Sequence, residues 1–181
     1  MIRTLLAIII SLLFISGCGQ NLDLEHRSDT ESKISQENKM PKEMPEDFNF
    51  SVSFGYGEVN KNEINTYDNT VTKDLIMKGT ATANFAFTKD EMQSIYEKMR
   101  EINIMGTKEF SQQGGCFKTP SNTESWKITV DGETKTFSWT DQNCSVTNDA
   151  NQLVELRTDI QQIIEGKDAY IALPMAEGGY D

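Results

Sequence analysis

The chain has 181 residues and a formal net charge of -11, and 37% of its residues are hydrophobic. This length suits one domain with a tail and is too short for two full-sized domains. Nucleic acid is not expected as a partner, because phosphate backbones are held by clustered Lys and Arg, whereas here 28 acidic residues outnumber 17 basic ones. One histidine and three cysteines leave little material for the common catalytic and metal-binding constellations.

The first residues have the organisation of an export signal. Arg3 precedes an apolar run of 11 residues, 5–15, far shorter than the roughly 20 residues that a bilayer-spanning helix needs. The sequence Ile15-Ser16-Gly17-Cys18 then resembles the lipobox of bacterial lipoproteins, in which small residues precede a cysteine that is diacylated before the signal is cut. The resemblance implies that residues 1–17 are removed and that Cys18 is the lipidated N-terminus. An ordinary secretory signal with an incidental cysteine is the alternative.

Residues 18–46 are expected to be a flexible tether between the lipid and the domain. They contain no apolar period, and as a flexible chain they would reach roughly 30 Å. The single His26 lies in this stretch, so we expect it to be solvated rather than catalytic. Loss of Arg3 with the signal makes the mature net charge -12, and such an acidic body is repelled by anionic headgroups. Two acyl chains suffice for stable membrane attachment without help from the domain.

The globular domain is predicted over residues 47–173. Alternation of apolar and polar residues indicates a first strand, with one buried face formed by Phe48, Phe50, Val52, Phe54 and Tyr56. Residues 70–77 and 82–87 are predicted as two further strands. Thr88-Lys89-Asp90-Glu91 matches a capping box, and the helical spacing of the apolar residues behind it predicts an amphipathic helix over 89–103.

The clearest strand pattern lies on both sides of Asp131-Gly132, over residues 126–139. Asp-Gly favours a two-residue type I′ turn, because both central positions need positive φ. This turn would set Val130 opposite Glu133 and Trp126 opposite Phe137. The resulting apolar face comprises Trp126, Ile128, Val130, Phe137 and Trp139. The opposite face is expected to remain in water.

A second amphipathic helix is predicted over residues 149–165, with Gly166 as its C-terminal stop. Residues 168–173 are interpreted as a short closing strand, and 174–181 as a loose tail. The order of strands, helix, hairpin and helix predicts an α+β domain, an antiparallel sheet with two helices packed on one face.

Cys116 and Cys144 stand on either side of the predicted hairpin. Export makes a disulfide their expected state, and it would clamp the open end of the hairpin. Closing a loop of this size is worth about 3–4 kcal/mol in the chain-entropy model. Redox activity is not expected, because the Cys-x-x-Cys spacing is absent.

Catalytic, cofactor and metal sites are not indicated by any motif, and we expect none. A calcium site from Asp68, Asn69 and Asp74 is the only metal arrangement considered, and these residues are expected instead in turns and at a strand edge. With 28 acidic residues, no carboxylate pair stands out for a hydrolase. A solvated acidic face is expected from Glu58, Glu63, Asp68 and Asp74.

The connection over residues 106–125 is long and carries Phe110 and Phe117. Loops of this length are often functional, so these two side chains are candidates for a binding loop. The alternative is that the aromatic side chains fold over an open sheet edge, where Cys116 staples them. A second candidate contact surface is the wet sheet face, to which Lys127, Thr129, Lys135 and Thr136 are assigned.

The mature domain resembles the small lipoproteins of low-GC Gram-positive bacteria, on the stretch NTYDNTVTKD (65–74) and on the helix start FTKDEM (87–92). The resemblance brings no activity with it. We therefore expect a monomer, lipid-anchored on the extracytoplasmic face of the cell membrane, that binds an envelope protein or other partner without catalysis. The alternatives are a carboxylate-based hydrolase of the cell envelope and a protease inhibitor that presents residues 106–125.

Overall fold

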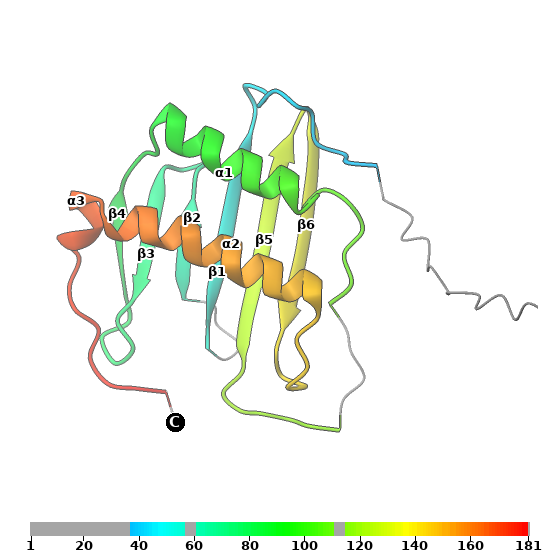
Figure 1. Cartoon of the computed structure of the whole chain (residues 1–181). Helices are drawn as coiled ribbons and strands as arrows, with labels where there is room; N and C mark the ends of the chain where they lie inside the picture. The colour runs from blue at the N-terminus through cyan, green and yellow to red at the C-terminus, as the bar shows by residue number, and fades with distance from the viewer. Residues whose placement is uncertain (1–36, 57–60, 111–114, 181) are drawn as a thin grey trace, which may run out of the picture. The chain divides into compact units, whose positions relative to one another are not determined.

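The computed structural model describes residues 37–56, 61–110 and 115–180 (Figure 1). Cys18, His26, the signal peptide and most of the predicted tether lie outside the described residues. In chain order the elements are β1 (Asn49–Tyr56), β2 (Asn62–Asn65), β3 (Thr70–Asp74), β4 (Thr80–Asn84), α1 (Lys89–Glu101), β5 (Asn122–Val130), β6 (Glu133–Thr140), α2 (Asn148–Glu165) and α3 (Asp168–Ile171).

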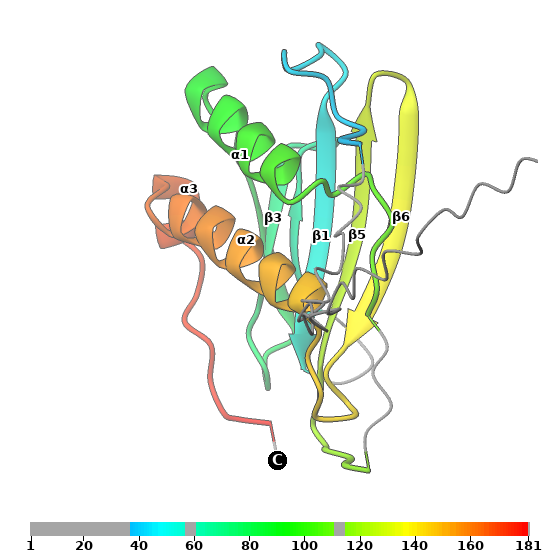
Figure 2. The ribbon, with the colours of Figure 1, turned by 45° about the vertical axis from the view of Figure 1, so that its right-hand side comes forward.

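The six strands form one antiparallel sheet in the order β4-β3-β2-β1-β5-β6. Strands β1 to β4 run as a meander to one side of β1, and the β5–β6 hairpin joins its other side. The predicted α+β class with an antiparallel sheet is confirmed. In Figure 2 the ribbons of α1 and α2 lie on the same side of this sheet.

The hairpin has the predicted register. Asp131 and Gly132 both have positive φ, 50° and 76°, and Val130 pairs with Glu133 as Trp126 pairs with Phe137. The carboxylate of Asp47 accepts hydrogen bonds from both turn amides, 3.0 Å from the nitrogen of Asp131 and 2.6 Å from that of Gly132. The turn is therefore tied to the chain that enters β1, a contact that the hairpin pattern alone did not indicate.

The same register corrects one assignment on the wet face. Lys135 pairs with Ile128, which is fully buried, so Lys135 lies on the apolar side of the hairpin and not with Lys127 and Thr136. Residues at pairing positions share a face of the sheet, and the assignment of Lys135 to the wet face overlooked this rule.

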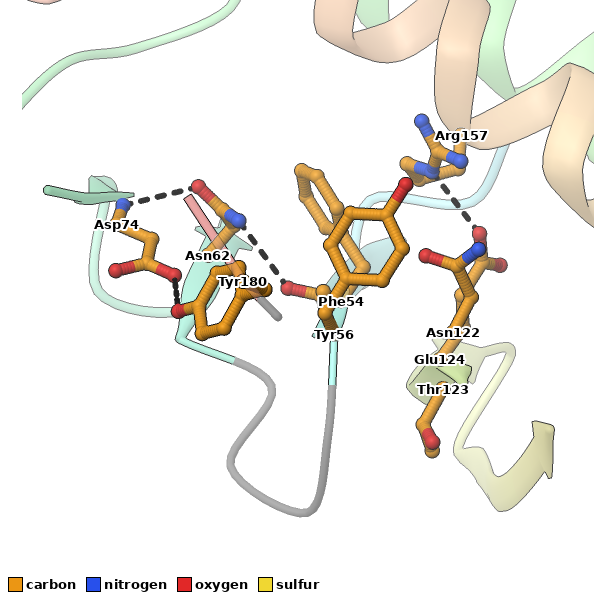
Figure 3. Close-up of a pocket in the computed structure, with 10 residues that line it drawn as sticks. Phe54, Tyr56, Asn62, Asp74, Asn122, Thr123, Glu124, Arg157 and Tyr180 are labelled. Carbon is orange, nitrogen blue, oxygen red and sulfur yellow. Dashed lines mark hydrogen bonds and ion pairs between the residues drawn. The ribbon is translucent and has the colours of Figure 1, made fainter. Parts of the chain in front are cut away.

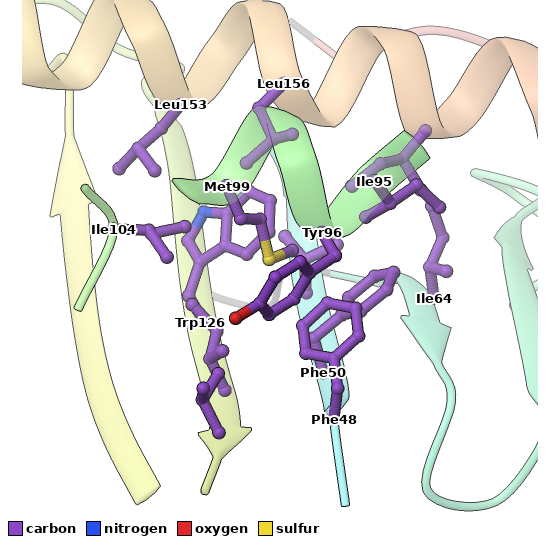
Figure 4. Packing of buried hydrophobic residues seen from close by; sticks show 14 of the residues in the cluster. Phe48, Phe50, Ile64, Ile95, Tyr96, Met99, Ile104, Trp126, Leu153 and Leu156 are labelled. Carbon is purple, nitrogen blue, oxygen red and sulfur yellow. The ribbon is translucent and has the colours of Figure 1, made fainter. Parts of the chain in front are cut away.

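The core lies between the sheet and the two long helices (Figure 4). Tyr96 of α1 is fully buried, its ring packs edge-on against Phe48 with centroids 5.0 Å apart, and its hydroxyl donates to the carbonyl of Pro41 at 2.8 Å. Other fully buried side chains come from strands and from both helices: Phe50, Val52, Ile64, Ile95, Met99, Trp126, Ile128, Leu153, Ile160 and Ile164.

Helix α1 has the predicted capping box, in which Thr88 Oγ1 accepts from the amide of Glu91 and Glu91 accepts from the amide of Thr88. The helix ends at Glu101, two residues before the predicted boundary. Lys167 contacts both carboxylate oxygens of Glu91, at 2.7 and 2.6 Å. The start of α1 is therefore tied to the segment that follows α2.

Three predicted strands differ from the structure. The strand predicted over residues 70–77 ends at Asp74, as β3. The strand predicted over residues 82–87 is β4, residues 80–84, and Phe85 and Phe87 follow it with their rings edge-on at 4.9 Å. Residues 168–171 form the helix α3 and not a closing strand. Tyr170 and Leu173 both pack against the core. Because they stand three residues apart, they share a face of a helix but would lie on opposite faces of a strand.

Both ends of the domain extend beyond the predicted boundaries. Met40 is buried, and Asn38 donates to the carbonyl of Arg100 near the end of α1 at 2.6 Å. Residues from 37 onward, assigned to the tether by sequence, thus contact the domain. In the predicted loose tail, Glu177 bridges to Ile76 and pairs with Lys78.

The Glu91–Lys167 contact gives a pH-dependent contribution to stability. Burial raises the pKa of Glu91, but the hydrogen bond and charge of Lys167, with the hydrogen bonds of Thr88, lower the pKa by more, so the net shift is downward. The contribution is therefore fully present at pH values above the ordinary pKa of a glutamate, about 4. It is lost as the pH falls through the lower pKa that Glu91 has in the folded state. We expect Glu91→Gln to reduce the free energy of unfolding at pH 7 by about 1 kcal/mol.

Urea unfolding at pH 7 and at about pH 3 checks this expectation, because the deficit of Glu91→Gln should shrink as Glu91 becomes protonated and comes to resemble glutamine. The matched control is Glu97→Gln on the same helix, where the carboxylate accepts only from Gln93 among the described residues. An equal deficit of Glu91→Gln at both pH values would contradict the assignment.

Candidate functional site

A cleft of about 230 Å³ opens at one end of the sheet (Figure 3). Its walls come from the ends of β1, β2, β3 and β5, from α2 and from the C-terminal segment. The side chains that determine its chemistry are Phe54, Tyr56, Asp74, Glu124, Arg157 and Tyr180.

Glu124 is buried, with 2% of its surface exposed, although it carries a carboxylate. Its Oε2 accepts from the indole Nε1 atoms of Trp126 and Trp139, each at 3.1 Å, and its Oε1 accepts from Nε of Arg157 at 2.9 Å. The strand geometry explains the cluster, because Glu124 pairs with Trp139 and stands two residues before Trp126, which puts all three on one face. Three N–H donors and one positive charge compensate the burial of this carboxylate.

Arg157 of α2 forms one wall of the cleft and is fixed on several sides. Besides Glu124 it binds Gln161, whose Oε1 lies 3.2 Å from Nη1, and its Cζ lies 4.9 Å from the centre of the Phe54 ring. Within the part of the chain that the structure describes, no hydrogen bond uses Nη2. The guanidinium is thus held in place while both N–H groups of Nη2 remain for a ligand.

Asp74 occupies the opposite side of the cleft and is also buried. It accepts hydrogen bonds from the Tyr180 hydroxyl and from the amide of Ile76, and Lys61 Nζ lies 4.0 Å away. The hydrogen bond to Asp74 raises the pKa of Tyr180, so this phenol stays neutral. The expectation that Asp74 belongs to a solvated face is wrong, because the C-terminal segment covers it.

Among the residues that the structure describes, the two carboxylates that line the cleft each face a cation, Arg157 and Lys61, so their charges are compensated. Two partly exposed tyrosines add flat apolar faces to its walls. Tyr56 is 49% exposed and Tyr180 38%, and their ring centroids lie 5.9 Å apart. The arrangement is suited to binding a small polar molecule that has a flat face.

The carboxylates are poorly arranged for hydrolysis. A glycosidase needs one carboxylic acid that donates a proton to the leaving group. Glu124 faces three N–H donors and accepts from all of them, and Asp74 accepts from a hydroxyl and an amide. Both are therefore engaged as acceptors by the protein itself.

The considered calcium site is not assembled. Asp68 accepts from the side chain of Asn65 at 2.9 Å, while Asp74 is directed to Tyr180. Among the residues that the structure describes, no group of three or more Asp, Glu, His or Cys side chains is placed to hold a metal ion.

The predicted disulfide between Cys116 and Cys144 is present, with Cα atoms 5.6 Å apart. It lies at the open end of the hairpin as expected. The same end is also held by Asp141, which contacts Lys118 at 2.6 Å and accepts from the amide of Asn122 at 2.8 Å.

The two aromatic candidates of the long connection are in different environments. Phe110 is half-buried and stacks on Phe137, with ring centroids 5.4 Å apart, so it covers the hairpin. Phe117, next to the disulfide, is 68% exposed. The connection ends at 121, since β5 begins at Asn122.

Sequence reasoning missed Glu124, Arg157 and Tyr180. For Glu124 a signal existed, because extending the alternation of Trp126 and Ile128 back by two residues puts a glutamate on the apolar face. A charge at such a position predicts a buried ion pair. Arg157 stands on an ordinary amphipathic helix and Tyr180 in a segment without periodicity, so neither stands out by pattern.

Comparisons of the chain with protein-family models, with curated proteins and with solved structures gave no match. Among the described residues, no helix has the length and apolar character required to cross a bilayer.

The Glu124 cluster can be tested by Glu124→Gln. The substitution places an amide NH2 among N–H donors and leaves the charge of Arg157 unpaired, so we expect the free energy of unfolding to fall by about 3–5 kcal/mol. Urea unfolding followed by tryptophan fluorescence measures it, and both indoles report on the site directly.

The matched control is Glu63→Gln on β2, where only the Asn65 side chain, at 3.4 Å, contacts the carboxylate among the described residues. The double variant Glu124→Leu with Arg157→Leu removes both buried charges but leaves the two indole N–H groups without their acceptor, so we expect it to recover only part of the loss. A loss below about 1 kcal/mol for Glu124→Gln would show that the carboxylate is not structurally required.

Proposed function

We propose that this protein is a lipid-anchored binding module on the extracytoplasmic face of the cell membrane, and that its cleft holds one ring of a neutral, hydroxyl-rich ligand, a saccharide unit. The observation that carries the proposal is the neutral cleft with two exposed tyrosine rings. Membrane attachment rests on the lipobox-like sequence that ends at Cys18.

The ligand class follows from the size and charge of the cleft. Its volume of about 230 Å³ is below the 300–1,000 Å³ typical of drug-sized ligands. Because both carboxylates are paired, a charged ligand would meet no unpaired counter-charge among the described residues that line the cleft. A pyranose ring has a weakly polar face for Tyr56 and equatorial hydroxyls for Asn62, Asn122 and the Nη2 group of Arg157.

The two other functions have weaker support. A hydrolase is disfavoured because Glu124 and Asp74 are both held as acceptors. The exposed Phe117 beside the disulfide is the one observation that favours a protease inhibitor, and it makes that activity the second candidate.

The anchor is tested by Cys18→Ala in a bacterial host that exports and lipidates proteins. We expect the unaltered chain to carry the mass of a diacylglyceryl group and the variant to lack it. Ser16→Ala keeps a small residue before the cysteine and serves as the control that should behave like the unaltered chain. A diacylglyceryl mass on the Cys18→Ala protein would contradict the assignment.

The cleft is tested with the exported Cys18→Ala protein and soluble glucose, N-acetylglucosamine and its β-1,4 dimer. We expect saturable binding with a Kd of about 1 mM for the preferred sugar, weakened about tenfold by Tyr56→Ala. Phe117→Ala removes an exposed aromatic ring outside the cleft and should leave binding unchanged. Titration calorimetry or amide chemical shifts measure the affinity.

Two other outcomes would establish one of the alternative functions. New reducing ends formed from the dimer would establish a hydrolase. Absence of sugar binding, together with protease inhibition that Phe117→Ala abolishes, would establish the inhibitor.

A further inference from the structure

A second cavity, of about 350 Å³, lies beside β6 where the chain leaves α1. Three lysines line it: Lys39, Lys108 and Lys135. We call this cavity the lysine pocket. Such a cluster is unexpected in a chain of net charge -11 with only 17 basic residues.

Lys135 is placed in the pocket by the hairpin register, on the apolar face of β6 opposite Ile128. Its Nζ donates to the carbonyl of Ile104 at 2.9 Å and to that of Gly106. An ammonium has three donors, so two of them are used by these carbonyls. Burial lowers the pKa of Lys135, and the positive charges of Lys108 and Lys39 lower the pKa further, while Asp149 and Glu133 act in the opposite direction. The charges of Lys108 and Lys39 thus act unfavourably on the ammonium group of Lys135.

The acids near the pocket balance only part of this charge. Lys108 is nearly buried, and its Nζ contacts Asp149 at 3.1 Å and the carbonyl of Ile102 at 2.5 Å. Glu133 is the one acidic residue among those that line the cavity. Lys39 is exposed, and within the described chain its side chain takes part in no hydrogen bond. Among the described residues that line the cavity, three lysines therefore face one glutamate, so the lining itself carries an excess of positive charge.

The remaining wall of the pocket is apolar. Phe110 and Phe137 stack with ring centroids 5.4 Å apart, and Lys135 Nζ lies 5.0 Å from the centre of the Phe137 ring. An occupant would meet ammonium groups on one side and a flat hydrocarbon surface on the other. This combination suits an anion that carries a small organic group better than a bare inorganic ion.

We propose that the lysine pocket binds a phosphate ester, with the phosphate between Lys39 and Lys135 and the organic part against Phe110 and Phe137. Phosphate oxygens are strong acceptors for ammonium donors, and the ligand would relieve the repulsion among the lysines. The site is distinct from the cleft at the end of the sheet and does not depend on the function proposed for that cleft.

Titration calorimetry of the exported Cys18→Ala protein with glycerol 3-phosphate tests the proposal. We expect a Kd of about 1 mM at low ionic strength, weakened about tenfold by Lys135→Met and by Lys39→Met. Lys39 is exposed, so its replacement tests the site even where Lys135→Met fails to fold. Lys89→Met removes the same charge from an exposed position at the start of α1 and should leave the affinity unchanged.

Three outcomes would overturn the proposal. They are the absence of saturable binding, an equal loss of affinity in Lys89→Met, and binding of inorganic phosphate as tight as that of the ester. A diester, glycerophosphoglycerol, distinguishes the two sources of this chemistry. Tighter binding of the diester indicates a polymer with phosphodiester links, and tighter binding of glycerol 3-phosphate indicates a free monoester, and both results support the site.

Discussion

The buried carboxylate of Glu124 is the interaction on which the cleft end of the domain depends. It joins three elements, because its acceptor oxygens take N–H donors from β5, β6 and α2. A buried carboxylate without a cation would be far too costly, so α2 must place Arg157 at this point of the sheet. Arg157 in turn packs over Phe54 at the end of β1. The position of α2, the orientation of two tryptophans and the wall of the cleft thus follow from one charge.

The irregular ends of the domain have the same role as the Glu124 cluster, since they satisfy groups that regular elements leave without partners. The segment that contains Asn38 and Met40 supplies a side chain to a carbonyl near the C-terminus of α1, where helices lack internal partners. Asp47 does the same for the turn amides of the hairpin. At the other end, Tyr180 covers Asp74 and brings a second aromatic ring to the cleft. Neither the N-terminal segment with Asn38 nor the C-terminal segment with Tyr180 shows a helical or strand periodicity of apolar residues, because each makes its contacts through single residues.

The fold was predictable where a strong local rule operated over many residues. Alternation together with Asp131-Gly132 determined the hairpin register, and the Thr88–Glu91 capping box determined the start of α1. Prediction failed over residues 168–173, a segment too short for the strand and helix periods to be distinguished. Much of the site was not predictable, because the roles of Asp74 and Arg157 depend on contacts with Tyr180 and Glu124 that are distant in sequence. Glu124 itself could be found, since its charge interrupts an apolar face.

The proposed phosphate site has to be reconciled with the strong net negative charge of the chain. Beyond the Debye length, about 8 Å at physiological ionic strength, the field of the domain is screened, and within it the ligand meets only the charges near its site. A nucleic acid extends well beyond this distance, so it would meet the net negative charge of the domain. A single phosphate placed between Lys39 and Lys135, as proposed, would meet mainly the positive charge of the pocket lining. Added salt screens both the repulsion between the ligand and the rest of the domain and the attraction between the ligand and the lysines of the pocket. We therefore infer a weaker salt dependence for this site than for a basic surface patch of equal charge.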